Sequence, residues 1–164
     1  MKKFLLFMMM LFSVTVFAGT VNAKVTNKIN FGISPKELQN IIKSEPLSDS
    51  HDDGNYAVYY YENIEDSLGI KRQLNSFAFS ENKLFSAVFD SVTTDEEHAK
   101  IIEAYKKNIN KISKEKMNIK EHKGALLLYN SKKIIEIYRV VDHTFINVAL
   151  YSAGKLNNSL KNYE

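Results

Sequence analysis

A helix-capping pattern followed by several β-rich segments occurs twice in this chain, and that order restricts the fold more than any other feature. Ser34 can cap a helix, Pro35 suits its first position, and Glu37 can reach back to the cap as the N3 residue of a capping box. Thr94 and Glu97 repeat the same spacing in the second half of the chain. We therefore expect one helix to begin after each cap and a group of strands to follow it.

The two predicted helices differ in length. Pro46 disfavours helical backbone before it, so the first helix is expected to end near Ser44. The second helix carries an apolar stripe and is predicted to run to about Met117. The apolar residues that recur at helical spacing are Leu38, Ile41 and Ile42 in the first helix, and Ile101, Tyr105, Ile109 and Ile112 in the second.

Each predicted helix precedes three segments rich in β-branched and aromatic residues. These segments cover residues 56–62, 72–79 and 84–92 in the first half, and residues 125–130, 133–141 and 144–151 in the second. The turns between most neighbouring segments are short, which is typical of antiparallel meanders. Residues 24–30 and 47–55 are polar and are predicted to be loosely held or to form loops.

These patterns predict a single α+β domain over residues 24–164. Residues 31–92 form the first α-β-β-β unit, residues 93–151 form the second, and residues 152–164 form a polar tail that frays. Each meander needs a helix to cover one of its faces. We therefore expect one antiparallel sheet, or two abutting sheets, with both helices on one face and an open opposite face.

Residues 1–23 have the three parts of a cleavable signal peptide. Lys2 and Lys3 form a basic start, residues 4–17 are largely apolar, and a compact segment ends at Ala23. The apolar run is shorter than the roughly 20 residues that span a bilayer. Cleavage after Ala23 is favoured over cleavage after Ala18, and an uncleaved anchor is the remaining alternative. The sequence thus predicts a periplasmic or secreted protein whose mature form has no transmembrane segment.

The chain contains no cysteine, so it cannot carry a lipid on an N-terminal cysteine or be held together by disulfides. Its stability must come from a packed core. The chain has 22 basic and 19 acidic residues, and two of the basic ones lie in the predicted signal peptide. This near-equality of basic and acidic residues is not typical of a nucleic-acid-binding protein. We therefore expect no nucleic-acid partner.

The acidic segment 49–55 resembles part of a calcium loop. Asp49, Asp53 and Gly54 fall at positions 1, 5 and 6 of such a loop, but Tyr60 stands where a bidentate glutamate closes the ligand shell. The missing carboxylate favours a solvated turn over a calcium site, and no metal site is predicted.

No pattern in the sequence predicts a catalytic site or a bound cofactor. The four histidines lack the spacing of zinc proteases, and those after residue 90 are expected in exposed turns or on an exposed helix face. The elbow motif of serine hydrolases and the glycine-rich motifs that bind nucleotides are also absent. We therefore predict that the protein is not an enzyme. The histidines are His51, His98, His122 and His143.

Residues 31–38 (Phe-Gly-Ile-Ser-Pro-Lys-Glu-Leu), the polar loop after Pro46 and the hairpin over residues 77–84 carry a resemblance. In these segments the chain resembles the small exported envelope proteins related to β-lactamase inhibitor protein and to the small outer-membrane assembly lipoproteins. It departs from that pattern in having Ile33 for methionine, in residues 43–46 where Gly-x-Pro is expected, and in lacking the lipidated cysteine. The resemblance implies a fold and the noncatalytic binding of another protein.

Strand alternation in the second half places a polar and aromatic set opposite the aliphatic residues. If the helices cover the aliphatic set, this second set lies on the open face, where tyrosines offer a large contact area at little cost in rotamer entropy. The alternative is that these side chains lie under loops or pack as cross-strand pairs. The candidate binding residues are Tyr129, Glu136, Tyr138, Asn147 and Tyr151.

Residues 100–123 contain eight lysines. Lys100, Lys107, Lys111 and Lys114 would share one side of a continuous second helix. Such a cluster can make a weak contact with an anionic surface, and the alternative is an ordinary solvated helix face.

Together these observations favour a noncatalytic exported domain that binds another protein of the cell envelope or the medium, such as an inhibitor or immunity factor for an envelope enzyme. One alternative is an assembly or structural accessory factor of the envelope that uses the lysine-rich helix. The other is a small hydrolase with an unrecognised site. A histidine and two carboxylates within hydrogen-bond reach in a cleft would favour the hydrolase, and a shallow open sheet would favour the binding domain.

Overall fold

The structure is a computed structural model that describes residues 23–51 and 55–163. The predicted signal peptide, apart from Ala23, lies outside the described residues. The helices are α2 (Pro35–Ile42), α3 (Asp95–Lys107), α4 (Ile109–Ile112) and α5 (Ala153–Lys161). The strands are β1 (Ser48–His51), β2 (Tyr56–Glu65), β3 (Lys71–Ser80), β4 (Lys83–Val92), β5 (Asn118–His122), β6 (Ala125–Tyr129), β7 (Lys133–Val140) and β8 (His143–Leu150).

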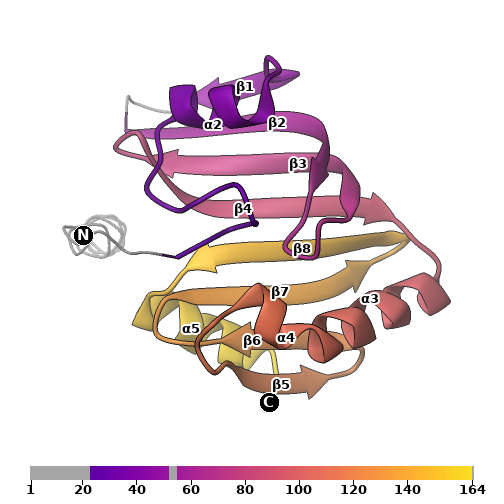
Figure 1. Ribbon diagram of the computed structural model, residues 1–164. Coiled ribbons are helices and arrows are strands. Elements are labelled where there is room, and N and C mark those ends of the chain that lie inside the picture. Colours follow the sequence, from indigo (N-terminus) through magenta and orange to yellow (C-terminus); the bar gives the residue numbers. More distant parts are fainter. Residues whose placement is uncertain (1–22, 52–54, 164) are drawn as a thin grey trace, which may run out of the picture.

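All eight strands belong to one antiparallel sheet in the order β1-β2-β3-β4-β8-β7-β6-β5 (Figure 1). The predicted α+β class is therefore confirmed, as is the antiparallel pairing. The halves of the chain meet where β4 pairs with β8, with Ala87 opposite Val148 and Phe89 opposite Ile146. These four residues are buried, so the central seam of the sheet is part of the core.

Both predicted capping boxes form. The backbone N–H of Glu37 donates to Ser34 Oγ at 3.3 Å, and the Ser34 N–H donates to the Glu37 carboxylate at 2.7 Å. Thr94 and Glu97 make the same reciprocal pair at 3.2 and 2.8 Å. These bonds satisfy backbone donors that the first turn of a helix leaves without partners, and they lower the pKa of each capping glutamate.

The prediction that the second helix runs to about Met117 is wrong. Helix α3 ends at Lys107, and after Asn108 the short helix α4 begins in a new direction. The Asn108 side chain donates to the Ala104 carbonyl at 2.9 Å, and an asparagine that bonds the backbone in this way competes with helix continuation. The apolar stripe of the sequence continues across this break because Ile109 and Ile112 still pack toward the core.

Strand β1 lies in the segment 47–55 that was predicted to be a loop, and β5 lies in a segment for which no strand was predicted. They are the two edges of the sheet, and nearly all of their residues are exposed. A polar edge strand that buries neither face has no apolar alternation by which a sequence could reveal it. His122 therefore lies on an edge strand and not in an exposed turn or on a helix.

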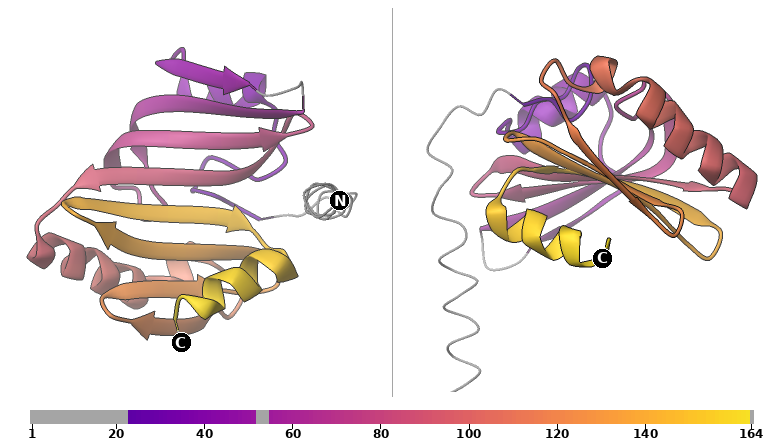
Figure 2. Two further views of the ribbon diagram at one scale, coloured as in Figure 1. Left: turned by 180° about the vertical axis from the view of Figure 1, so that it is seen from behind. Right: turned by 90° about the horizontal axis from the view of Figure 1, so that it is seen from below.

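The predicted fraying tail instead forms helix α5. Ser152 caps it by accepting the Lys155 N–H at 3.1 Å, and Leu156 and Leu160 are half-buried. Figure 2 (right) shows α2 and α3 on one side of the sheet and α5 on the other. The face predicted to be open is therefore partly covered.

Residues 24–30 were expected to be loosely held, but the segment 23–31 that contains them packs into the core. Lys24 and Asn30 form an isolated antiparallel bridge, and Val25 and Ile29 are 0% and 2% exposed. Thr26 Oγ1 stabilises the turn between them by accepting the Ile29 N–H at 3.2 Å. In Figure 1 this segment crosses the helix-covered side of the sheet between α2 and α4.

Candidate functional site

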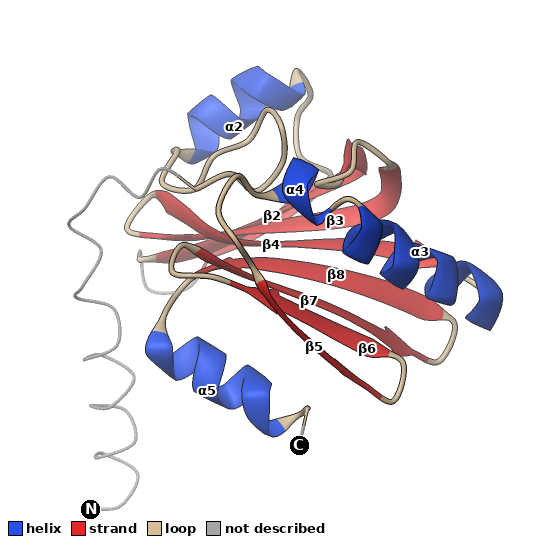
Figure 3. Ribbon diagram, turned by 60° about the horizontal axis from the view of Figure 1, so that its bottom comes forward, coloured by secondary structure: helices blue, strands red, loops and turns tan. Residues whose placement is uncertain are grey.

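The open part of the sheet lies on the side opposite α2 and α3. Seen from behind, β2, β3, β4 and β8 carry no helix, whereas α5 lies over the β5–β7 end (Figure 2, left). Figure 3 shows the same separation, with α5 alone beneath the sheet. We call the exposed and half-buried side chains of β2, β3, β4, β7 and β8 on this side the open face.

The strand register identifies the residues of the open face. On the paired strands β4, β8 and β7, Val88 lies opposite Asn147, and Asp90 and Tyr138 both lie opposite Phe145. On β3, small residues occupy the middle of the face. Further members given by the register include Val58, Tyr60, Leu74, Ser76, Ala78, Ser86 and His143.

Aromatic rings line this face at two places. The Tyr138 and Phe145 rings stack with centroids 5.5 Å apart. The His143 ring, two residues before Phe145 on β8, also stacks on Phe145, with centroids 6.0 Å apart. Nearer the β1 edge, Tyr56 and Phe85 lie 5.9 Å apart. Stacked rings are held in position by one another, so they can contact a partner without losing much rotamer freedom.

Aliphatic side chains add to the exposed apolar area. Leu74, Val92 and Val140 are 43%, 52% and 53% exposed, and Val92 and Val140 lie on either side of His143 in the register. Exposed apolar residues that lie together are more informative than scattered ones, because they often mark interaction sites.

One ion pair interrupts this apolar surface. His143 Nδ1 lies 2.9 Å from Asp90 Oδ1, and this hydrogen bond raises the pKa of the histidine above its usual value. The second nearby carboxylate, Asp142, is 3.8 Å from His143 Nε2, beyond hydrogen-bond distance. The arrangement lies on the flat of the sheet and does not match the cleft with two bonded carboxylates expected of the hydrolase alternative.

Four of the five predicted binding residues share this side of the sheet, as the register shows for Tyr129, Glu136, Tyr138 and Asn147. Tyr138 and Asn147 are half-buried and border the uncovered strands. Glu136 is only 7% exposed because α5 lies over it: Lys155 Nζ is 2.9 Å from its carboxylate. Asn147 also donates to Glu136 at 3.1 Å.

The other two predicted residues are less accessible than the sequence suggests. Tyr129 lies on β6 beyond Glu136, where the neighbouring Leu127 and Ile134 are fully buried on the α5 side. Tyr151 follows β8 and is half-buried, with its N–H donating to the Lys132 carbonyl at 2.9 Å. Sequence alternation gave the correct side for these strands but could not show that a helix covers that side.

Sequence analysis missed Phe145 and all the members of the open face that come from the first half of the chain. Val88, Phe85 and Leu74 were assigned to strands without a face. A signal existed in the alternation of Phe77 and Phe79 with Ser76 and Ala78, since the phenylalanines are buried and the small residues are half-buried. The centre of the open face depends on which strands join the two halves of the chain. Only the structure shows that these strands are β4 and β8.

Within the described residues no group of three histidine, cysteine or carboxylate side chains could hold a metal ion. His98, predicted to be exposed, is buried: its ring nitrogens bond Thr144 Oγ1 at 2.9 Å and the Gly124 carbonyl at 2.6 Å. Thr144 is itself 1% exposed, so this pair cannot reach a substrate. In the segment tested as a calcium loop, Asp49 and His51 belong to β1, and residues 52–54 lie outside the described residues.

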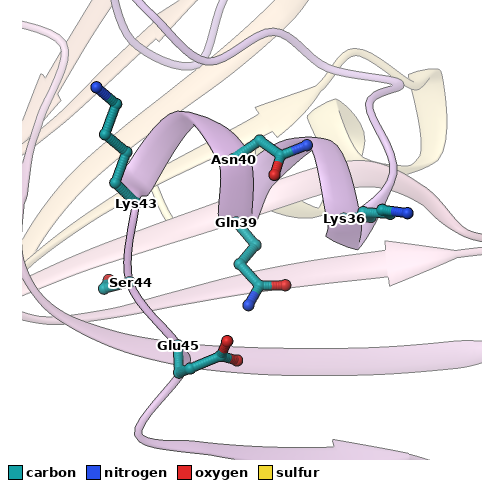
Figure 4. Close-up of a pocket in the computed structure, with 6 residues that line it drawn as sticks. All are labelled: Lys36, Gln39, Asn40, Lys43, Ser44 and Glu45. Atoms are coloured by element: carbon teal, nitrogen blue, oxygen red, sulfur yellow. The ribbon is translucent and has the colours of Figure 1, made fainter.

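A shallow pocket of about 470 Å³ lies at the end of α2 (Figure 4). Its walls are side chains of α2 and the following loop, and all but the half-buried Gln39 are exposed. Glu45 is its one acid, and no buried polar group points to a reaction there. The lining residues are Lys36, Gln39, Asn40, Lys43, Ser44 and Glu45.

The predicted lysine cluster is split by the break at Asn108. Lys100 and Lys107 lie on α3, Lys111 lies on α4, and Lys114 lies beyond it. Lys100 is also paired with Glu96 at 2.7 Å. The four ammonium groups therefore do not form the single helical row that the sequence suggested.

No protein-family model, curated protein or solved structure matches this chain. In the part of the chain that the structure describes, none of the helices has the length and apolar character needed to cross a membrane.

Proposed function

We propose that this protein is a noncatalytic exported domain that binds another protein through the open face. The observation that supports this proposal is the part of the sheet that carries no helix on the side opposite α2 and α3, where Tyr138, Phe145 and Leu74 are at least partly accessible. A monomer gains nothing from leaving such residues in water, whereas a partner that covers them gains from their burial. An inhibitor or immunity factor for an envelope enzyme is the form of this function that the sequence resemblance favours.

We further propose that the sheet arose from two tandem units. The order β1-β2-β3-β4 is mirrored by β8-β7-β6-β5, and a capped helix precedes each group of four strands. On this proposal α5 is an addition to the second unit. It covers part of the second unit's half of the proposed binding side and leaves the first unit's half uncovered. The open face then lies mainly on the first unit and on β8.

The partner contact should centre on the stacked rings of Tyr138 and Phe145. Truncating a central aromatic anchor commonly costs about 2 kcal/mol or more of binding, which is roughly a thirtyfold loss of affinity. Both rings are half-buried on a solvent-facing side, so Tyr138→Ala and Phe145→Ala should each lower stability much less than a core truncation.

The test begins with capture of partners by the purified protein from its own envelope and secreted fractions. The affinity of the captured protein is then measured for Tyr138→Ala, Phe145→Ala and the control Lys107→Ala, with a urea melt for each variant. Loss of binding in the two aromatic variants, with the control unchanged, supports the open face. If only Lys107→Ala weakens binding, the accessory-factor alternative through the lysine-rich helix is correct instead.

A further inference from the structure

A cavity of about 510 Å³ lies where the N-terminal segment, the end of α4 and the β6–β7 turn meet. It is on the helix-covered side of the sheet, because Lys133 in its wall alternates with Ile134 and is in register with Leu150. Five lysines and one glutamate are the charged residues of its wall. The lysines are Lys24, Lys111, Lys114, Lys132 and Lys133, and the glutamate is Glu115.

Lys133 is the buried cation of this cavity, with only 4% of the residue exposed. Its ammonium donates to the backbone carbonyls of Lys24 at 3.0 Å and Ile112 at 2.8 Å. Among the described residues its third hydrogen has no acceptor, and no carboxylate lies within ion-pair distance. Burial without a counter-charge lowers its pKa to about 8, and such burial is costly unless another group compensates it.

The other lysines leave the cavity strongly positive. Glu115 forms an ion pair with Lys132, whose Nζ lies 2.5 Å from the Glu115 carboxylate. Lys24, Lys111 and Lys114 have no carboxylate within ion-pair distance in residues 23–51 and 55–163. A concave site lined by charges of one sign concentrates ions of the opposite sign.

Two hydroxyl groups in the wall add neutral donors. Thr26 Oγ1 accepts backbone N–H groups of Lys28 and Ile29, and Ser113 Oγ accepts from Glu115 N–H and the Asn130 amide. Each hydroxyl therefore already acts as an acceptor, and among the described residues its own hydrogen has no acceptor. The cavity thus offers lysine and hydroxyl donors to an incoming oxyanion.

We propose that this cavity binds the phosphate group of a small phosphomonoester, with Lys133 and Ser113 at its base and Lys111 and Lys114 at its rim. A phosphate carries nearly two negative charges and three strong acceptor oxygens, which suits several lysines and hydroxyls better than a single carboxylate does. The volume exceeds what one phosphate group fills, so an organic body fits beside it. This site is separate from the open face and does not depend on the function proposed for it.

The test is a calorimetric titration of the full chain at about 150 mM salt, where weak surface attraction is screened. The probes are inorganic phosphate, glucose 6-phosphate and acetate. We expect saturable binding of both phosphates with a dissociation constant below about 1 mM, and none of acetate. If inorganic phosphate binds and glucose 6-phosphate does not, the proposal that the ligand is a phosphomonoester is overturned.

Lys133→Met removes the buried charge at similar volume and should weaken phosphate binding at least about tenfold, or 1.4 kcal/mol. A double variant, Lys111→Gln with Lys114→Gln, changes only exposed residues and should therefore fold. It tests the site even if Lys133→Met does not fold. Its matched control is Lys100→Gln with Lys107→Gln, which removes the same charge from α3 outside the cavity.

Weaker binding in the rim pair with unchanged binding in the control pair supports the site. Equal losses in the two pairs would mean that phosphate responds only to overall charge, and this would overturn it. The same follows if no saturable binding is seen up to about 10 mM phosphate, or if a folded Lys133→Met protein binds as tightly as the original chain.

Discussion

Lys155 of α5 and Glu136 of β7 form an ion pair with Nζ 2.9 Å from Oε2, on the side of the sheet opposite α3. The Glu136 side chain is 9% exposed, and the Lys155 side chain is 38% exposed. This pair is the point at which the C-terminal helix closes part of the surface predicted to be open. It therefore marks the boundary between the part of this side that α5 covers and the part that stays uncovered.

Lys155→Ala should loosen α5. Among the described residues Glu136 would keep only the Asn147 amide as a donor. Because Lys155 is partly exposed, the expected loss is about 1 kcal/mol of unfolding free energy. Hydrogen exchange of the amides at residues 153–161 should become faster, while exchange in β4 and β8 stays slow. The control is Lys161→Ala, whose lysine has no carboxylate within ion-pair distance among the described residues. Unchanged exchange in α5 would show that the ion pair does not hold the helix.

Asp66→Asn should be strongly destabilising. Asp66 Oδ2 accepts hydrogen bonds from Arg72 Nε at 2.9 Å and Nη2 at 2.6 Å, and both side chains are almost fully buried. Asparagine keeps an acceptor for the Leu68 and Ile70 N–H groups but leaves Arg72 as a buried charge without its partner. The expected loss is about 3 kcal/mol, measured by urea denaturation.

The exposed Asp142→Asn is the matched control and should change stability little. Removing the arginine charge as well, with Asp66→Asn and Arg72→Met together, should recover part of the loss. If the single variant melts like the original chain, the charge pair is not what stabilises the β2–β3 turn.

Val141→Asn should stabilise the protein. Val141 has φ of 58°, in the left-handed region that a β-branched residue rarely adopts, and it is 85% exposed, so it contributes little burial in return. Asparagine tolerates this conformation, and the expected gain is about 1 kcal/mol, seen as a higher urea midpoint at constant slope. Val92→Asn, on an exposed strand position, is the control and should give no gain. A lower midpoint for Val141→Asn would contradict the account.

Lys133 should make stability rise with pH above about 8. Its folded-state pKa is about 8, below the ordinary 10.5, because burial disfavours the charged ammonium. Below about pH 8 both states hold the proton, and this group gives no pH dependence. Above it the unfolded chain holds the proton more tightly, so the free energy of unfolding increases toward the ordinary pKa.

Urea melts from about pH 7 to 9 should show the start of this rise, in a range where few tyrosines of the unfolded chain are ionised. Lys133→Met should remove it, and Lys132→Met, which changes a partly exposed lysine, should not. A pH dependence that is the same in the original chain and in Lys133→Met would mean that the buried amine does not titrate in this range.

The sequence alone determined the features that depend on neighbouring residues. The Ser34 and Thr94 caps form as predicted because a hydroxyl and a carboxylate three residues apart are sufficient to satisfy the first helical turn. The alternation of Ile135 and Ile137 with Glu136 and Tyr138 gave the side of β7 correctly, since the strand period is two residues regardless of what the strand packs against.

Tertiary structure decided everything that depends on which elements meet. The polar edge strands β1 and β5 pair through backbone groups, so their side chains carried no signal. The pairing of β4 with β8 placed Leu74 and Phe145 on one surface, and the packing of α5 buried Glu136 on that surface. Lys133 became a buried cation only because residues 23–31 and α4 close over it, and no periodicity in the sequence encodes contacts between segments so far apart.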